Sequence, residues 1–284
     1  GPLGDCTSKA LIPKAATGAA DVVARHEGIV AGLPAAEVAV HLIDPSLKWI
    51  AEGAEGSRVA PGQRVARIAG PARGIFAAER LTLNLLSRLS GIATLARRYM
   101  DAVADTSARI YDTRKTTPGW RRLEKYAVGV GGACNHRTGL FDAILIKDNH
   151  LAFGRESTWG TAHFSAAEAV AHARQWIKRR IPQLVRARMI VEIEVDSLEQ
   201  LDEILPAGPD LVLLDNMPPV QLREAVARRN ARAPEVELEA SGGVSLETVR
   251  QIAETGVDRI SVGALTHSCE ALDFGLDWVH ASET

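Results

Sequence analysis

Hydrophobic positions after residue 108 occur in short runs separated by segments with helical periodicity. The runs are RIYD, AILIKD, IVEIEV, LVLLDN, VELEASGG and RISVGA. Such alternation is typical of parallel strands joined by crossover helices. Six runs are clear, and a seventh strand near GGACNH would leave the sheet one strand short of an eight-stranded barrel. The pattern predicts an α/β fold with an incomplete, seven-stranded α/β barrel over residues 108–265 as the catalytic domain.

The first 107 residues have a different pattern. Two β-like stretches, ADVVARHEGIVAG and RVARIAGPARG, flank the helical segment PAAEVAVHLI. Glycine and proline punctuate the strands, which favours short elements joined by turns. We predict a small N-terminal α+β sandwich, with residues 1–107 as one domain that includes a long linking helix.

Two further helices are expected at the borders of the barrel. Leucines and isoleucines recur every three to four residues in 75–104, which predicts a long helix, interrupted near Ser90 and Gly91. The stretch CEALDFGLDWVHA predicts a C-terminal helix within residues 266–284 that packs back on the N-terminal domain. Between the second and third strands, Ser165 and Glu168 have the spacing of a capping box before an amphipathic helix, and FGRESTWGTAHF ahead of them predicts an exposed loop.

Composition narrows the range of functions. The 284 residues are 46% hydrophobic and 24% charged with a net charge of −2, so neither a nucleic acid nor an anionic membrane is an expected partner. No apolar run has the length of about 18 residues that a spanning helix needs. The three cysteines lack metal-ligand spacing, which favours a reducing compartment, and we predict a cytoplasmic protein.

Polar residues follow the predicted strands. The active groups of a barrel project from the carboxyl ends of its strands, and a single polar strand end would be an ordinary solvated loop. Six such ends in one chain predict a site. The residues are Thr113, Arg114, Lys115, Lys147, Asp148, Asn149, Glu192, Glu194, Asp215, Asn216, Ser241, Gly242, Gly243 and Gly263.

A cationic set stands out among them: Arg114, Lys115, Arg137 and Lys147, with His136 beside them. Arginine grips carboxylates and phosphates with paired hydrogen bonds, so this set predicts a strongly acidic substrate. Surface ion pairs of the two arginines with Asp112 or Glu124 are the alternative. The Arg121-Arg122 pair falls on a predicted helix, where a solvated face is expected.

An acidic set lies on the next strands. In VEIEV the period of two sends Glu192 and Glu194 to the face opposite Ile193, which is the barrel interior. Buried carboxylates are costly unless they meet cations or a metal. With Asp215, Glu194 predicts an oxygen-ligand site suited to Mg²⁺, and a glutamate–lysine ion pair inside the barrel remains the alternative.

Two glycine-containing turns follow the last two strands. SGGV begins at Ser241 and VGAL ends at Leu265. Exposed backbone N–H groups at such strand-to-helix turns can hold a phosphate. Each turn alone is a weak signal, but the two together predict a phosphate site.

These motifs resemble those of a known enzyme family. YDTRKTTPGWRRLEKYAVGVGGACNHRTGLFDAILIKDNH, VEIEVDSLEQL, LVLLDNMPP, EASGGV and ISVGALTHS are similar to quinolinate phosphoribosyltransferase, the carboxylating nicotinate-nucleotide diphosphorylase, over nearly the whole chain. The resemblance implies an open-faced sandwich and a seven-stranded α/β barrel in a homodimer, with a higher oligomer as an alternative. It also implies the reaction of quinolinate with phosphoribosyl pyrophosphate (PRPP) and Mg²⁺ to give nicotinate mononucleotide, pyrophosphate and CO₂, a step of NAD biosynthesis.

The resemblance also implies roles for individual residues. Those of the dicarboxylate pocket would be Arg114, His136, Arg137 and Lys147, with Arg88 supplied by the partner subunit. Lys115 would contact PRPP beside Thr113, and Glu194 and Asp215 would hold the ribose hydroxyls and Mg²⁺. Those near the 5′-phosphate would be Ser241, Gly242, Gly243, Gly263 and His267.

Three other functions stay open at this stage. A relative could act on another acidic heterocycle. A Schiff-base aldolase could use Lys147, because such lysines end barrel strands. A protein that binds a phosphorylated ligand without turnover is the non-enzyme alternative.

Overall fold

The computed structural model describes residues 4–156 and 165–279 and divides into two compact units. The first unit holds Gly1–Arg97, Arg122–Gly132 and Ser268–Thr284; the second holds Arg98–Arg121 and Ala133–His267. The second unit thus begins at Arg98, whereas the sequence predicted a boundary near residue 107, and the segment 122–132 belongs to the first unit. At Gly131 this segment lies against the long helix, since a Cβ there would lie 2.4 Å from the carbonyl oxygen of Ala93. Only glycine allows so close an approach to the long helix.

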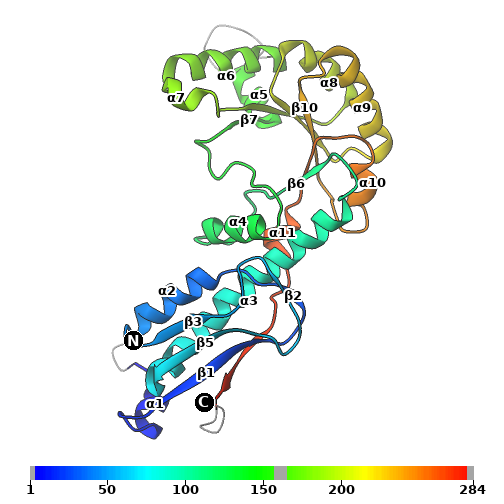
Figure 1. Cartoon of the computed structure of the whole chain (residues 1–284). Helices are drawn as coiled ribbons and strands as arrows, with labels where there is room; N and C mark the ends of the chain where they lie inside the picture. The colour runs from blue at the N-terminus through cyan, green and yellow to red at the C-terminus, as the bar shows by residue number, and fades with distance from the viewer. Residues whose placement is uncertain (1–3, 157–164, 280–284) are drawn as a thin grey trace. The chain divides into compact units, whose positions relative to one another are not determined.

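An antiparallel sheet in the order β12-β1-β5-β3 forms the base of the first unit (Figure 1). Its elements are α1 (Cys6–Leu11), β1 (Thr17–Ala24), β2 (Gly28–Ile29), α2 (Leu33–Ile43), β3 (Lys48–Ala51), β4 (Arg58–Val59), β5 (Arg64–Pro71), α3 (Ala72–Ala102), α4 (Arg121–Val130) and β12 (Phe274–Trp278). One face of the sheet packs on α2 and α3 through a core that includes Val22, Val40, Ile68 and Leu86. The predicted sandwich with one open face is confirmed.

The open face of this sheet is polar because its strands alternate. Asp21 lies between the buried Ala20 and Val22 on β1. Its carboxylate accepts hydrogen bonds from Arg67 Nε at 2.6 Å and from Arg64 Nη1 at 3.0 Å. These two cations lower the pKa of Asp21, with the Arg67 hydrogen bond as the largest cause.

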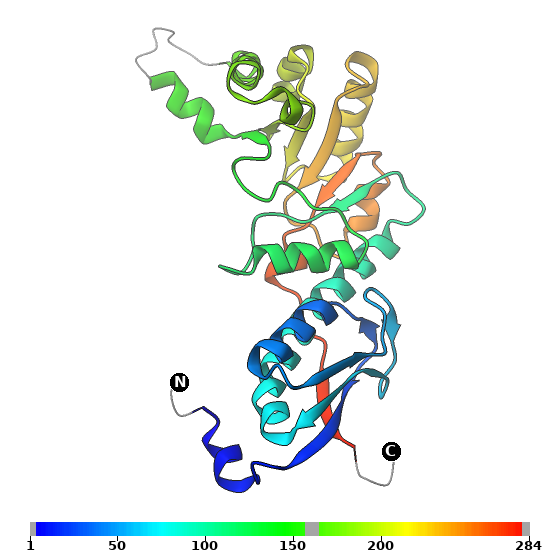
Figure 2. The same ribbon diagram turned by 60° about the vertical axis from the view of Figure 1, so that its left-hand side comes forward.

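The C-terminal helix prediction is wrong. Residues Phe274–Trp278 form β12, which pairs antiparallel with β1 in the register Ala20↔Trp278 and Ala24↔Phe274; Figure 2 shows this red strand beside the blue β1. Apolar residues at 272, 274, 276 and 278 alternate with other types, which is the period of a strand. The segment does return to the N-terminal unit as predicted, but as an edge strand.

The long helix α3 runs without the interruption that Ser90 and Gly91 suggested. The Ser90 hydroxyl accepts a hydrogen bond from the N–H of Ala31 at 2.9 Å. A Cβ on Gly91 would lie 2.0 Å from the carbonyl oxygen of Glu270. The small residues therefore let two other segments of the first unit approach the helix closely.

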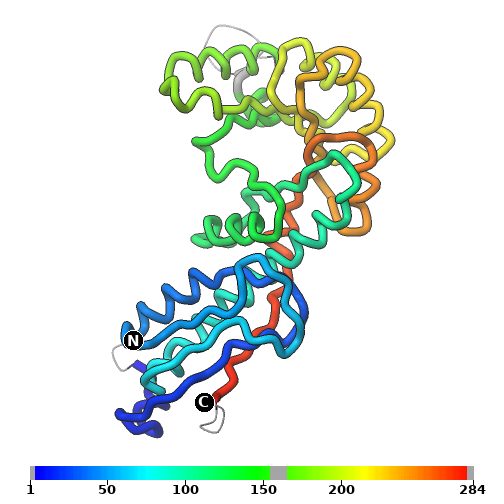
Figure 3. Tube along the Cα trace, in the orientation of Figure 1, coloured from blue at the N-terminus to red at the C-terminus, as the bar shows by residue number. Residues whose placement is uncertain are grey.

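The second unit is built on a parallel sheet in the order β6-β11-β10-β9-β8-β7. Its elements are β6 (Arg109–Tyr111), β7 (Ile144–Ile146), α5 (Asp148–Glu156), α6 (Ala166–Arg180), α7 (Gln183–Arg186), β8 (Val191–Val195), α8 (Leu198–Ile204), η1 (Leu205–Ala207), β9 (Leu211–Asp215), α9 (Pro219–Arg232), β10 (Glu237–Ser241), α10 (Val249–Ala253), β11 (Arg259–Ser261) and α11 (Ala264–His267). The Cα trace in Figure 3 follows their alternation. All six predicted strands are present, and the incomplete barrel is confirmed.

The seventh strand expected near GGACNH is reduced to a single parallel bridge between Tyr111 and Cys134, on the outer side of β6. Helices α6 and α8 pack on β8, and α10 packs on β11. The buried residues Val191, Ile193 and Val195 face these helices. Glu192 and Glu194 consequently face the barrel interior, as the period of two predicted.

The segment between β7 and β8 contains the predicted capping box. The Ser165 hydroxyl accepts a hydrogen bond from Glu168 N–H, and the Glu168 carboxylate accepts one from Ser165 N–H. The exposed loop expected over 153–164 begins within α5, and its residues 157–164 lie outside the described part of the chain. No helix in 4–156 or 165–279 has the length and apolar character needed to cross a membrane.

Candidate active site

A cavity of about 280 Å³ opens at the carboxyl ends of the barrel strands. The residues that line it are Thr113, Arg114, Lys115, His136, Arg137, Leu145, Lys147, Glu194, Leu213, Asp215, Glu239, Ser241 and Ser261. All of them belong to the second unit. Parallel pairing explains the convergence: each strand points the same way, so the polar residues that follow the strands meet at one edge.

The structure brings together the predicted cations. Arg114, Lys115, Arg137 and Lys147 all line the cavity. Burial and the neighbouring charge of Arg114 lower the pKa of Arg137. The Nε of Arg114 is buried, and within the described part of the chain it has no hydrogen-bond acceptor. Cations that repel each other and a donor without an acceptor fit a multiply anionic ligand.

The alternative for Arg114 and Arg137 was a surface ion pair with Asp112 or Glu124, but both carboxylates bind other groups. One oxygen of Asp112 accepts a hydrogen bond from the N–H of His136 at 2.8 Å. Glu124 accepts hydrogen bonds from Arg88. Asp112 is fully buried, so it fixes the segment that carries His136 and Arg137. Sequence reasoning had treated this carboxylate only as an ion-pair partner.

Arg121 has a role that the sequence did not reveal. Its guanidinium donates hydrogen bonds to the Thr116 hydroxyl at 3.0 Å, the Thr138 carbonyl at 3.2 Å and the Arg114 carbonyl at 3.3 Å. The prediction of a solvated helix face is wrong for this residue. By tying two loops together, Arg121 fixes the backbone from which Arg114 projects.

The acidic set meets the cationic set at Glu194. Lys147 Nζ donates a hydrogen bond to Glu194 Oε2, so the glutamate–lysine pair that the sequence left open is present. Asp215, at the end of the adjacent strand β9, accepts a hydrogen bond from the Asn216 amide at 2.8 Å. Glu194 and Asp215 also line a second depression with Asp148 and Asp196. Their oxygen atoms are the donor type that Mg²⁺ prefers.

The two glycine turns lie on neighbouring strands, because β10 and β11 pair in the register Ala240↔Ile260. Gly242 and Gly243 have φ values of +96° and +61°, which non-glycine residues rarely adopt. A Cβ on Gly242 would lie 2.1 Å from Oδ1 of Asn216. The turn therefore depends on glycine, and its backbone is open to a ligand.

Gly263 lies close to two predicted site residues. A Cβ there would lie 3.0 Å from His267 Nε2 and 3.2 Å from Lys115 Cδ. The Thr266 hydroxyl donates a hydrogen bond to the Lys115 carbonyl at 2.7 Å. Lys115, Gly263 and His267 thus gather beside the glycine turns, although Gly242, Gly243, Gly263 and His267 do not line the cavity itself.

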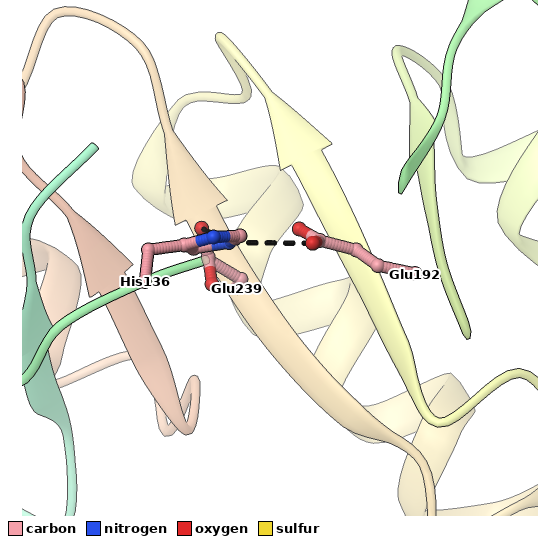
Figure 4. A group of neighbouring side chains, drawn as sticks. All are labelled: His136, Glu192 and Glu239. Atoms are coloured by element: carbon pink, nitrogen blue, oxygen red, sulfur yellow. Dashed lines mark ion pairs between the residues drawn. The ribbon is translucent and has the colours of Figure 1, made fainter. Parts of the chain in front are cut away.

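His136 is held at both of its ring nitrogens. The N–H of Arg137 donates a hydrogen bond to His136 Nδ1 at 2.8 Å, which places a ring proton on Nε2. Nε2 lies 3.2 Å from Glu192 Oε2 and 3.5 Å from Glu239 Oε1. Figure 4 draws the three side chains. Both ring nitrogens are therefore engaged by the protein.

Glu239 and Ser261 are site residues that sequence reasoning missed. Both line the cavity. The signal was present, because VELEA repeats the alternation of VEIEV and sends Glu239 to the interior as VEIEV sends Glu192. Arg88 lies in the first unit, and the described residues of the cavity do not include it.

An open α/β barrel whose strand ends combine cations, carboxylates and glycine turns defines an enzyme class that handles acidic and phosphorylated substrates. Two family models match the chain: the N-terminal domain of quinolinate phosphoribosyl transferase over residues 5–90 and its C-terminal domain over residues 92–277. The chain belongs to this family.

Individual relatives agree with this assignment. The chain is 44% identical to the nicotinate-nucleotide pyrophosphorylase [carboxylating] of Mycobacterium leprae, over 96% of this chain and 90% of the relative. A probable enzyme of the same name from Bacillus subtilis is 39% identical over 99% and 90% of the two chains. The solved structure of NadC from Streptococcus pyogenes superposes with a TM-score of 0.85 at 34% identity, over 97% and 92% of the two chains.

Proposed function

We infer that this chain transfers the phosphoribosyl group of PRPP to quinolinate and removes the 2-carboxylate, giving nicotinate mononucleotide, pyrophosphate and CO₂. The observation that carries this function is the cavity itself, where Arg114, Arg137 and Lys147 meet Glu194 and Asp215. One cavity thus offers cations for a dicarboxylate beside carboxylates for a ribose.

The cations bind and orient the acceptor. Quinolinate carries two adjacent carboxylates, and two arginines with a lysine can neutralise both. Each charge-assisted hydrogen bond contributes about 1.5 to 3 kcal/mol. Holding the pyridine nitrogen in line with the ribose C1 removes much of the entropic barrier to the transfer.

The carboxylates act on the donor side. When pyrophosphate leaves, positive charge develops at the ribose C1, and nearby carboxylates stabilise that charge. We propose that Glu194 and Asp215 also hold Mg²⁺, which when bound would neutralise charge on the leaving pyrophosphate. Lys115 and the turns at Gly242 and Gly263 would hold the phosphates of PRPP.

Decarboxylation follows from the first product. Once its nitrogen carries the ribose, the pyridine ring is cationic, and this charge stabilises the electron pair left on C2 when CO₂ departs. The aldolase alternative is weaker, because the Lys147 ammonium is bonded to Glu194 and an ammonium is not a nucleophile.

The test is a direct assay. Protein with Mg²⁺, quinolinate and PRPP should form nicotinate mononucleotide and CO₂ without ATP, and nicotinate in place of quinolinate should be a poor acceptor because it uses fewer of the cations. Absence of product from the folded protein would exclude this function. Tight binding of quinolinate without turnover would favour a binding protein.

We also propose a homodimer with shared active sites, in which Arg88 of one subunit completes the site of the other. Arg88 is held by a buried glutamate of its own unit, so its position does not depend on the substrate. Arg88→Ala and Lys147→Ala should each abolish turnover. Mixing the two inactive variants should restore about a quarter of the sites. With random pairing about half of the dimers are mixed, and one of the two sites in each mixed dimer has both native residues. No rescue in mixed dimers would exclude shared sites.

A further inference from the structure

His136, Glu192 and Glu239 form a buried cluster, and two of its members, His136 and Glu239, line the same cavity as the predicted cations. Glu192 on β8 and Glu239 on β10 are both 0% exposed, and the His136 side chain is 8% exposed. Both carboxylates lie near Nε2 of the imidazole, at 3.2 Å for Glu192 and 3.5 Å for Glu239, and Figure 4 shows Glu192 beside the ring. Within the described residues, none of the four carboxylate oxygens has a hydrogen-bond partner of normal geometry. Two dehydrated anions this close are unstable unless a cation or a proton lies between them.

A metal ion does not fit this cluster, although the three residues offer ligand atoms within 4.8 Å of one another. Because His136 Nδ1 accepts the hydrogen bond of Arg137 N–H, a ring proton is on Nε2. This proton occupies the side of the ring that faces both carboxylates. To bind a metal ion, Nε2 would need a free lone pair. A proton, rather than a metal ion, therefore compensates the charge of the two carboxylates.

The charges around Glu239 decide which acid carries the proton. Burial is the largest cause that raises the pKa of Glu239, to about 7, and the charge of Glu192 is the next. His136, the Ser261 hydroxyl and Arg259 act in the opposite direction. Glu239 also lines the substrate cavity, whereas Glu192 does not.

We propose that Glu239 is a catalytic acid that donates the proton replacing the lost carboxylate on the pyridine ring. The inference rests on the proposed function. The bond between C2 and its carboxylate breaks, CO₂ leaves, and the electron pair remaining on C2 takes the proton of the Glu239 carboxyl. Glu239 is left as a carboxylate, and water restores its proton after the product leaves. His136, whose Nε2 lies 3.2 Å from Glu192 Oε2, acts as a positioning residue.

The test separates the two chemical steps in a single turnover, with pyrophosphate release reporting transfer and CO₂ release reporting decarboxylation. Glu239→Gln keeps the shape of the side chain but has no acidic proton. We expect CO₂ release to slow about 100-fold or more, in the range of general acid catalysis, while pyrophosphate release slows less than about 10-fold and the doubly carboxylated nucleotide accumulates. Equal slowing of both steps, or of neither, would overturn the proposal. Loss of pyrophosphate release in the wild type would instead contradict the proposed function.

Glu192→Gln is the matched second variant. Its Gln removes the negative charge that raises the pKa of Glu239, so Glu239 should lose its proton at lower pH. The rate of CO₂ release should fall as pH rises in the wild type, and this fall should move to lower pH in the variant. A pH profile that does not move would overturn the proposal.

A measurement on the wild type covers the case in which Glu239→Gln does not fold. Infrared titration should show a buried carboxylic acid that ionises near pH 7, and Glu192→Gln should shift the midpoint downward. Ionisation of all carboxyl groups below about pH 5, near their ordinary values, would overturn the proposal. Stoichiometric Mn²⁺ binding that is lost in Glu239→Gln but retained in Asp215→Asn would show a metal ion in the cluster, and it would also overturn the proposal.

Discussion

The guanidinium of Arg88 donates two hydrogen bonds to one oxygen of Glu124, from Nη2 at 2.6 Å and from Nε at 3.2 Å. Glu124 on α4 is fully buried, and the Arg88 side chain on α3 is 27% exposed. Both residues belong to the first unit. This ion pair therefore links the segment 122–132 to the long helix.

The first prediction concerns that pair. Arg88→Met should lower the free energy of unfolding by about 3 kcal/mol, because it leaves a buried carboxylate without its cation. Glu124→Gln should cost less, and the double variant should be more stable than Arg88→Met alone. Urea denaturation of the four proteins forms a double-mutant cycle that measures the coupling. Strictly additive effects would mean that the pair contributes nothing.

Lys147 should be essential for the acceptor. Lys147→Ala removes a cation of the acceptor pocket with its charge-assisted hydrogen bond, so kcat/KM for quinolinate should fall about 100-fold or more, which makes this variant inactive in the mixing experiment. Glu194, freed from its lysine, should also perturb binding of PRPP. Lys178→Ala, an exposed position on α6, is the control and should retain full activity. Steady-state kinetics with each substrate varied separately would check both effects.

Gly242 should tolerate no side chain. Gly242→Ala combines an unfavourable φ of +96° with a Cβ 2.1 Å from Asn216 Oδ1. Gly208, with a φ of +60° and open space around its Cβ position, provides the control for backbone strain alone. Gly208→Ala should cost about 1 to 2 kcal/mol of stability and leave the KM for PRPP unchanged, whereas Gly242→Ala should raise that KM. Equal KM values in the two variants would exclude the glycine turn from the phosphate site.

Glu239 should make stability depend on pH. Its ordinary pKa of 4.5 rises to about 7 in the folded protein, so between these values the folded state keeps a proton that the unfolded state releases. This contribution is therefore fully present below about pH 4.5, declines as pH rises and is lost near pH 7, at about 1.4 kcal/mol per pKa unit.

Denaturation at several pH values would measure the slope. Glu239→Gln should flatten it across this window, because the amide does not titrate. Glu199→Gln, an exposed position on α8, should leave the slope as it is in the wild type. Identical slopes in all three proteins would mean that Glu239 ionises at its ordinary pH.

The sequence determined the elements whose signal is local. Strand runs, the capping box at Ser165 and the polar strand ends depend on period, spacing and residue type, and each of these is readable along the chain. The resemblance of long motifs then supplied the family. One misassigned element, 274–278, had the period of a strand within a segment whose composition suggested a helix.

Tertiary structure alone decided which groups share charges and protons. Arg121 donates a hydrogen bond to the loop residue Thr116, and Arg88 pairs with Glu124, which lies 36 positions away in the sequence. The orientation of His136 depends on a backbone N–H that donates a hydrogen bond to its Nδ1. The raised pKa of Glu239 needs burial and Glu192 from another strand. Electrostatic effects depend on distance in space and on exclusion of water, and neither is a property of a local sequence.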